Sequence, residues 1–454
     1  MAVSAGRAAI GTGIRVGIVA DDLTGAADTG VQFAKRGLPA RLVCAPSLPG
    51  KTGGRRLSTG AARSPVLVLN TRSRNYGAGE AAQATRAAVS RLRDREILFK
   101  KIDSTLRGNV GAEIDAAMAA SAHPRAVLTA AYPEQGRVTV DGTHYVDGVP
   151  LALAEAARDP LAPVRESRVC AIVGLQSRHQ VGCAGRAGAY GGARRLAEAL
   201  EEQFRSGVHI LAADAVDSAD LRALARATLS LQQRPLLCGT AGLAGAVAEL
   251  LAAGPAGLRP AAPPSGPEAA ADPAGSVLIV CGSASETSRR QIDFLLGRGR
   301  AVLFAFPPGE LPADAPGSEA WVERAAARVL RLMLPGALTV VGARPDGPAP
   351  AGLVAGLLGR LAARLLAEGG CPLKGLVLTG GDTAEAVLGQ LAIRELQLLE
   401  EALPGVPLSR PCWGRWRGLA VLTKAGAFGG EDTLWRCGEY LRRGYSSWDG
   451  DGSE

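Results

Sequence analysis

Apolar runs alternate with helix-like segments along most of the chain. The first half contains five runs with the length and composition of buried strands, at 14–20, 40–45, 64–74, 97–105 and 125–133. Between the third and fourth runs, residues 80–94 place apolar side chains on one face of an amphipathic helix. Strands that alternate with helices in this way predict an α/β fold with a mostly parallel sheet flanked by helices.

Residues 252–275 interrupt this pattern, because they are rich in Pro, Ala and Gly and show no apolar periodicity. Such a composition is typical of a linker. Beyond it the alternation resumes, with strands expected at 276–285, 337–343, 374–383 and 418–429. A chain of 454 residues is also long for a single core. We therefore expect two α/β domains, at 1–251 and 276–454, joined by this linker.

Two adjacent carboxylates, Asp21 and Asp22, follow the first expected strand. One of them can cap the helix that comes next, since Asp is a favoured N-cap residue, but this leaves the other unexplained. Carboxylates at a strand end can also grip sugar hydroxyls, hold a metal ion or act as a general base. Ligands of open parallel sheets bind at the carboxyl ends of the strands. A functional role for Asp21 and Asp22 is therefore an alternative to helix capping.

The turn after the fourth expected strand gathers polar side chains that suit a polyhydroxy acid. Arg107 can bind a carboxylate through two parallel hydrogen bonds, whereas Asp103 and Ser104 can hold hydroxyl groups. Lys101 and Asn109 complete the group. The alternative interpretation is a surface cluster of salt bridges.

Residues 131–151 contain two Asp-Gly pairs, which predict a β-hairpin or a loop. Most of this segment needs no role beyond the hairpin itself. Within it, Gln135, Gly136 and Arg137 are the candidates for contact with a ligand.

Three strand ends of the second expected domain consist of small residues, at 280–285, 378–384 and 422–432. Backbone N–H groups in such turns can approach phosphates closely. Each turn alone is a weak signal, but three in one domain predict a nucleotide site.

Composition narrows the classes of partner and cofactor. The net charge of +8 comes from 51 basic and 43 acidic residues, and no basic run is interleaved with aromatic residues. We therefore expect no nucleic-acid partner but a mild field that attracts small anions. The eight cysteines form no CxxC pair, which argues against a zinc framework and a disulfide scaffold, and Cys170 and Cys281 are expected to be small buried residues. With no apolar run of 18 residues, we expect a cytoplasmic protein without a membrane partner.

With these residues in view, the chain resembles the four-carbon acid sugar kinase family. The resemblance runs nearly end to end through ordered blocks: ADDLTGAADTG, KKIDSTLRGNVGAE, YPEQGRVTVDGTHYVDGVPL, GTAGLA, GSAS, GGDTAEAV and TKAGAFGGED. It implies a sugar-acid-binding first domain, a nucleotide-binding second domain and an active site in the cleft between them. The implied reaction is phosphorylation of a tetronate-type sugar acid by ATP, with Mg²⁺ on the phosphate oxygens.

The matching positions give the expected site. Residues expected to contact the sugar acid are Asp21, Asp22, Arg74, Lys101, Asp103, Ser104, Arg107, Gln135, Gly136 and Arg137. Residues expected to contact ATP are Ser283 or Ser285, Gly380, Gly381, Asp382, Thr383 and Gly426. Asp22 is the expected general base, and Asp382 is a rival base or metal contact. No dedicated metal cage is expected, because phosphate and water can supply most Mg²⁺ ligands.

Two positions depart from the family pattern. Arg72 stands where an acidic or small residue is expected, and Ala425 stands where Ser is common. Two other functions remain open: a kinase for another small hydroxy acid, and a non-catalytic sugar-acid sensor on the same fold. The intact ATP-contact blocks argue against the sensor. The sequence leaves the oligomeric state open, a homo-oligomer included.

Overall fold

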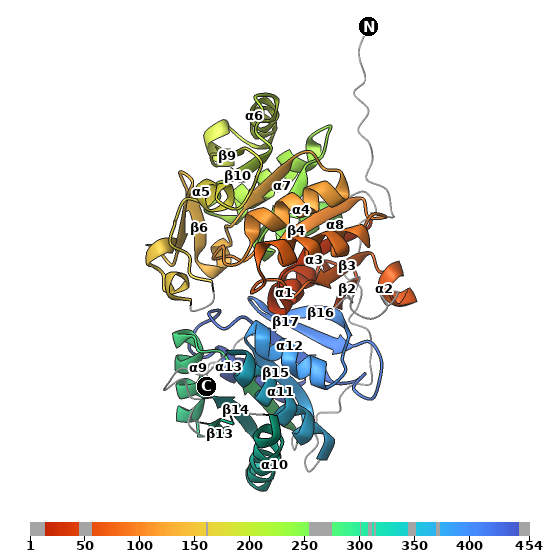
Figure 1. Cartoon of the computed structure of the whole chain (residues 1–454), viewed down its shortest axis with the longest axis vertical. Helices are drawn as coiled ribbons and strands as arrows, with labels where there is room; N and C mark the ends of the chain where they lie inside the picture. The colour runs from red at the N-terminus through yellow and green to blue at the C-terminus, as the bar shows by residue number, and fades with distance from the viewer. Residues whose placement is uncertain are drawn as a thin grey trace. The chain divides into compact units, whose positions relative to one another are not determined.

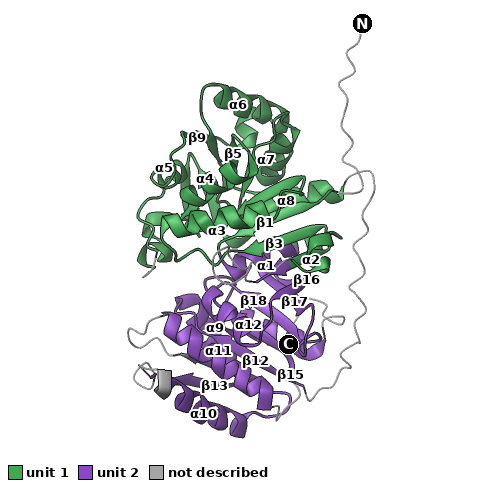
Figure 2. Cartoon of the chain, turned by 45° about the vertical axis from the view of Figure 1, so that its right-hand side comes forward, with its two compact units in different colours: residues 1–21, 32–41, 46–261 green, residues 22–31, 42–45, 262–454 purple. Residues whose placement is uncertain are grey.

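The computed structural model describes residues 14–44, 57–159, 162–253, 275–299, 301–306, 311–312, 315–343, 351–368 and 373–444 (Figure 1). The chain divides into two compact units, coloured separately in Figure 2. The first comprises residues 1–21, 32–41 and 46–261, and the second comprises residues 22–31, 42–45 and 262–454. The division passes between the adjacent carboxylates Asp21 and Asp22. Of the expected linker, residues 254–274 lie outside the described residues.

The sheet of the first unit is parallel. Its strands follow the order β3-β1-β4-β11-β5-β10-β9, and each neighbouring pair runs in the same direction. Their bounds are β1 (Val16–Ala20), β3 (Val66–Asn70), β4 (Ile97–Lys101), β5 (Ala126–Thr129), β9 (Val181–Ala184), β10 (Ile210–Ala213) and β11 (Leu236–Gly239), and the short β2 spans Ala40–Val43. The strands expected in the first half are present, and the predicted α/β class is confirmed.

Helices connect these strands, and two of them have side-chain caps at their N-termini. In the first unit, α3 (Ala78–Ser90) packs beside α4 (Val110–Ser121), and α7 (Ser218–Ser230) packs beside α6 (Ala193–Arg205) and α8 (Ala241–Ala252). The side chain of Asp217 accepts a backbone N–H at the start of α7, and that of Thr240 does so for α8. Such caps satisfy N–H groups for which the first helical turn has no partner.

The strand register brings three polar segments to one edge of this sheet. Ala20 at the end of β1 lies opposite Asn70 at the end of β3. Lys101 at the end of β4 lies opposite Gly239 at the end of β11. Because the strands are parallel, the segments that follow β1, β3 and β4 leave the sheet at the same edge, as the sequence predicts.

The predicted hairpin is confirmed as a small antiparallel sheet of β6 (Arg137–Val140), β7 (Thr143–Val146) and β8 (Val149–Pro150). In its first turn φ is 49° at Asp141 and 75° at Gly142, and the second Asp-Gly pair repeats this geometry. Two consecutive positive φ angles define the tight turn that Asp-Gly favours.

The sheet of the second unit is parallel with an antiparallel extension. Its order is β13-β14-β12-β15-β18-β17-β16, in which only the pairs β16–β17 and β17–β18 are antiparallel among the pairings of the described residues. The strands are β12 (Ser276–Cys281), β13 (Ala301–Phe306), β14 (Leu338–Ala343), β15 (Leu373–Thr379), β16 (Glu395–Leu403), β17 (Val406–Pro411) and β18 (Ala420–Lys424). The helices are α9 (Glu286–Gly297), α10 (Ala315–Leu332), α11 (Ala351–Glu368), α12 (Gly381–Gln390) and α13 (Thr433–Arg443). Its core includes aliphatic side chains of β12, β14, β15 and β18.

One expectation about the cysteines is wrong. Cys170, at the start of the helix α5 (Val169–Gly174), is only half-buried and forms a disulfide with the exposed Cys183 in β9. This pairing could not be predicted from the sequence, because the two residues have no motif spacing and meet only when α5 packs against β9. Cys281 is buried, as expected. In the described part of the chain, no helix has both the length and the apolar content needed to cross a bilayer.

Candidate active site

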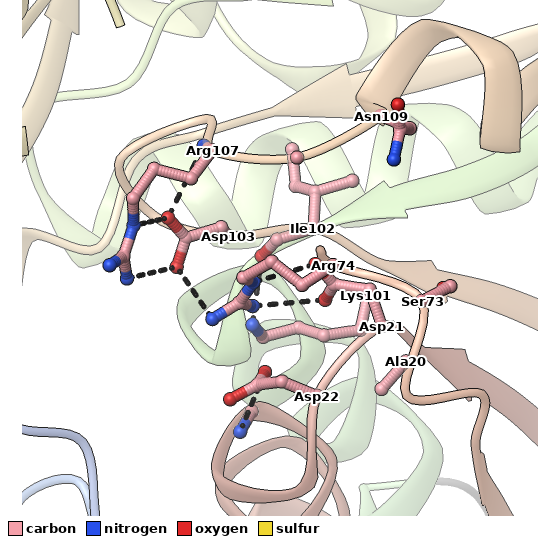
Figure 3. A network of polar contacts seen from close by, with 12 residues as sticks. Ala20, Asp21, Asp22, Ser73, Arg74, Lys101, Ile102, Asp103, Arg107 and Asn109 are labelled. Atoms are coloured by element: carbon pink, nitrogen blue, oxygen red, sulfur yellow. Dashed lines mark hydrogen bonds and ion pairs between the residues drawn. The ribbon is translucent and has the colours of Figure 1, made fainter. Parts of the chain in front are cut away.

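Alternating carboxylates and guanidinium groups form a chain at the edge where β1, β3 and β4 end (Figure 3). Arg74 donates from Nε and Nη2 to the two carboxylate oxygens of Asp21, at 2.8 and 3.0 Å. Its Nη1 lies 3.6 Å from Asp103 Oδ1. Arg107 donates from Nε to Asp103 Oδ2 at 2.8 Å and from Nη1 to Asp159 Oδ2 at 2.9 Å. The structure thus brings four of the expected residues together and adds Asp159.

The cations of this chain keep its acids ionised. Burial alone would raise the pKa of Asp21, but the charges of Arg74 and Lys100 lower it below its ordinary value. Burial would likewise raise the pKa of Asp103, yet the charges of Arg107 and Arg74 hold that pKa well below its ordinary value. The charge of Asp103 in turn raises the pKa of Arg107. Both arginines therefore have carboxylate partners within the protein itself.

The neighbouring lysines of β4 have different surroundings. Lys100 Nζ forms a buried ion pair with Glu113 Oε2 of α4 at 2.8 Å, and Glu113 also accepts the hydroxyl of Ser73. Lys101 is 5% exposed, and its Nζ donates to the backbone oxygen of Ile102 at 2.8 Å. Across the residues that the structure describes, no carboxylate lies at ion-pair distance from Lys101. The pairing of Lys100 with Glu113 could not be predicted from the sequence, because it depends on how α4 packs against the sheet.

The hairpin contributes His144, which the sequence did not mark as functional. Its Nε2 lies 2.8 Å from the backbone oxygen of Ser104, and its Nδ1 lies 3.0 Å from Thr139 Oγ1. Burial lowers the pKa of His144 to about 4. The neutral ring can therefore donate to Ser104 and accept from Thr139, which anchors the turn that carries Asp103.

Gln135, Gly136 and Arg137 lie where this hairpin begins. Gly136 has φ of 71°, and a Cβ there would overlap the side chain of Asp147. Arg137 donates to the backbone oxygen of Gln135. Burial lowers the pKa of Arg137, while the charges of Asp147 and Asp103 partly offset this effect. The structure thus places Arg137 within electrostatic range of the carboxylate chain.

Asp22 caps the helix that follows it, which is one of the roles that its sequence position allows. It precedes α1 (Leu23–Ala34), where its Oδ1 accepts the N–H of Gly25 at 3.1 Å as a helix cap. Its Oδ2 accepts the hydroxyl of Thr24 at 2.6 Å. Within the same compact unit, a Cβ added to Gly381 would lie 3.1 Å from Asp22 Oδ2. Asp22, near the start of the chain, therefore lies against the Gly-Gly-Asp-Thr turn far along it.

Three Gly-rich strand ends converge in the second unit. A Cβ on Gly426 would overlap Ser283 Oγ, and a Cβ on Gly380 would lie 3.5 Å from Ser283 Cβ. Ser283 Oγ also hydrogen-bonds Ser285 Oγ at 3.1 Å. Gly380 has φ of 96°, which side chains rarely tolerate. The close approach of the turns therefore requires glycine at position 426, whereas at position 380 the backbone conformation favours glycine.

α12 begins at this convergence without a side-chain cap, since Gly380 is its N-cap residue. Its first turn exposes Asp382, while Thr383 is buried against Gly282. A helix N-terminus presents N–H donors and a partial positive charge, both of which suit a phosphate group.

The two departures from the family pattern have different settings. Arg72 is exposed and has a left-handed backbone with φ of 58°. Ala425 follows the buried Lys424 and accepts a hydrogen bond from its Nζ through the backbone oxygen, at 2.8 Å. The contact made by Ala425 therefore involves its backbone, whatever its side chain.

The chain is similar to known proteins over nearly its whole length. A family model described as a sugar-binding N-terminal domain matches residues 16–247, and one described as a nucleotide-binding C-terminal domain matches residues 278–434. A D-threonate kinase from Bordetella bronchiseptica is 36% identical over 441 residues, which cover 94% of this chain and 97% of that protein. The chain belongs to the four-carbon acid sugar kinase family.

A further kinase and a solved structure resemble the chain over nearly its full length. A 3-oxo-tetronate kinase from Methylobacterium radiotolerans is 31% identical over 441 residues, covering 93% of this chain and 98% of that protein. A crystal structure from Salmonella typhimurium LT2 has a TM-score of 0.73 at 23% identity, covers 93% of this chain and 98% of that chain, and shows the same fold. Family membership confirms the expected class of enzyme, a kinase with a hydroxyl group as acceptor.

Proposed function

We propose that this protein transfers the γ-phosphoryl group of ATP to a hydroxyl group of a four-carbon sugar acid, with D-threonate as the first candidate. The choice of D-threonate follows the relative that is 36% identical over nearly its full length. The observation that carries the proposal is the position of Gly381 against Asp22 Oδ2. It sets a carboxylate that can accept a proton beside a helix N-terminus that can bind phosphate.

The carboxylate chain of the first unit is the proposed binding region for the sugar acid. The buried Lys101, close to this region, has no carboxylate at ion-pair distance among the described residues. We therefore assign its ammonium group to the carboxylate of the substrate. Arg74 and Arg107 are held by Asp21 and Asp103, and we assign the acids of these pairs to substrate hydroxyls. Ser104 and Arg137 border the same turn.

The Gly-rich turns of the second unit are the proposed binding region for ATP. The backbone around Gly380, Gly426 and Ser283 offers N–H groups that a phosphate can approach. No group of three His, Cys, Asp or Glu side chains is placed to hold a metal ion in the described part of the chain. Mg²⁺ would accordingly be held mostly by phosphate oxygens and water, with Asp382 as a further contact, and would neutralise charge on the phosphates.

In the proposed reaction, a substrate hydroxyl oxygen forms a bond to the γ-phosphorus of ATP. The bond from that phosphorus to the bridging oxygen of ADP breaks, and Asp22 accepts the hydroxyl proton. Thr24 and the N–H of Gly25 hold the carboxylate of Asp22 in place while it does so.

The proposal is tested by ADP release from Mg-ATP with D-threonate, L-threonate, D-erythronate and their 3-oxo forms. We expect turnover of at least one acid, and Asp22→Asn should lower kcat by about 100-fold or more, within the range of general-base catalysis. Asp28→Asn, in the same motif but inside α1, is the matched control. If the protein binds ATP but turns over no acid on the panel, the proposed substrate class is wrong. If it does not bind ATP, the result favours the sugar-acid sensor.

A further inference from the structure

A buried lysine with no acidic partner lies beneath one of the proposed phosphate-binding turns. Lys424, the last residue of β18, is fully buried, and burial lowers its pKa to about 8. Its Nζ donates to the backbone oxygens of Ala425, Gly426 and Phe428, at 2.8, 3.0 and 3.1 Å. None of the described carboxylates lies at ion-pair distance from this ammonium group.

Two side chains of α9 bind the same loop from its buried side. Gln291 Nε2 donates to the backbone oxygens of Phe428, Gly429 and Gly430, at 3.0, 3.2 and 2.9 Å. Ser288 Oγ donates to the oxygen of Gly426 at 3.0 Å. Both side chains are fully buried. Five backbone oxygens of the loop 425–430 are thus directed at three buried donors.

This arrangement fixes the direction of the N–H groups. In a trans peptide the N–H points away from the C=O of the preceding residue, and no cis peptide occurs in the described residues. When the oxygens of Ala425, Phe428 and Gly429 face inward, the N–H groups that follow them face outward. The outer side of the loop is accessible, since Gly429 and Gly430 are exposed and Gly426 is half-exposed. Outward N–H groups close together form a concave site for an anion.

We propose that Lys424 is a positioning residue for the phosphates of the nucleotide: it holds the loop oxygens inward, turns the loop N–H groups toward the phosphates, and supplies a buried positive charge behind them. Ser288 and Gln291 complete the set of donors. This inference rests on the proposed use of ATP and adds a residue that the family motif does not by itself place in contact with the ligand. An ammonium group without a carboxylate partner among the described residues gains from an anion bound across the loop.

The test is equilibrium binding of Mg-ATP, inorganic triphosphate and adenosine to Lys424→Met, measured by calorimetry without sugar acid. We expect the affinity for ATP and triphosphate to fall about tenfold or more, because backbone oxygens lose their donor and the phosphates lose a charge. The affinity for adenosine should stay within about twofold, since adenosine has no phosphate. Lys374→Met, at the opposite end of the neighbouring strand β15, is the matched control and should bind all three as the wild type does.

Milder variants guard against misfolding of Lys424→Met. Ser288→Ala and Gln291→Met remove donors to the same loop with small changes of volume, and each should weaken triphosphate more than adenosine. Equal triphosphate binding by the wild type and all three variants would overturn the role of Lys424 and leave the kinase proposal intact. Failure of the wild type to bind ATP or triphosphate would overturn both. A parallel loss of adenosine and triphosphate affinity would also overturn the inference, because it indicates general loosening of the site.

Discussion

Arg74 holds Asp21 through two parallel hydrogen bonds, from Nε to Oδ2 at 2.8 Å and from Nη2 to Oδ1 at 3.0 Å. The two residues follow neighbouring parallel strands, and the side chain of Asp21 is 5% exposed. A guanidinium group that donates from two of its nitrogens to one carboxylate has a fixed orientation. The first acid of the Asp-Asp pair therefore orients a cation, which separates its role from that of Asp22.

Asp21→Asn should destabilise the protein by about 3 kcal/mol at pH 7, because it removes the charge partner of a largely buried arginine. The free energy of unfolding in urea measures this loss. Glu198→Gln is the matched control, since Glu198 pairs with Arg194 in a fully exposed i,i+4 ion pair, and its loss should cost less than about 1 kcal/mol. Equal losses in the two variants would contradict a structural role for the Asp21–Arg74 pair.

Gly381→Ala should lower kcat about tenfold, because its Cβ would lie 3.1 Å from Asp22 Oδ2 and shift the proposed base. Gly389→Ala is the matched control on the same helix, since a Cβ there meets no atom within 4 Å. This control should keep full activity and gain up to about 1 kcal/mol of stability, because Ala is the better helix former. Steady-state kinetics of both variants measure this effect. Full activity in Gly381→Ala would contradict the proposal that the reaction depends on the contact of Asp22 with the phosphate-binding turn.

Lys101→Met should raise the KM for the sugar acid about tenfold or more and leave the KM for ATP unchanged, because a buried charged donor to the substrate carboxylate is lost. Initial rates at varied concentrations of each substrate measure the two KM values separately. Lys35→Met, an exposed position at the end of α1, serves as the control. If the KM for ATP rises instead, the assignment of Lys101 to the sugar acid is wrong.

Lys424 should make nucleotide binding and stability respond to pH in opposite directions. Its pKa is about 8 in the folded protein and near 10.5 in the unfolded chain, so between these values the unfolded state binds more protons. Raising the pH from 8 to 10 should therefore stabilise the wild type relative to Lys424→Met, while its affinity for triphosphate falls toward that of the variant.

The groups that face Lys424 do not reverse this sign. They are Cys281 of β12 and Cys437 of α13, and burial raises the pKa of both thiols, that of Cys437 to about 12. Raised thiol pKa values lower stability as the pH rises past the unfolded pKa, but both thiols are present in the wild type and in Lys424→Met, so this effect is shared by the two proteins that are compared. Parallel measurements of urea unfolding and triphosphate binding at pH 7, 8, 9 and 10 check the expectation. A difference between wild type and Lys424→Met that does not change with pH would refute it.

The sequence by itself determined the features that depend on neighbouring residues. The ends of β1, β3 and β4 follow from where apolar runs meet polar residues, and the hairpin turns follow from Asp-Gly, which tolerates positive φ. Parallel strands then require these ends to share one edge of a sheet. For this reason the fold class and the main groups of candidate residues could be predicted.

Only the tertiary structure decided which side chains pair. β16 (Glu395–Leu403) consists of Glu, Leu, Gln and Ala, which favour a helix, yet it forms a strand because it pairs with β17. The hydrogen bonds of Gln291 with the loop 425–430, and the contact of Asp22 with Gly381, join segments that are distant in the chain. The physical reason is that charge, burial and hydrogen bonding act over a few ångströms in space, and a pattern along the chain contains no such distances.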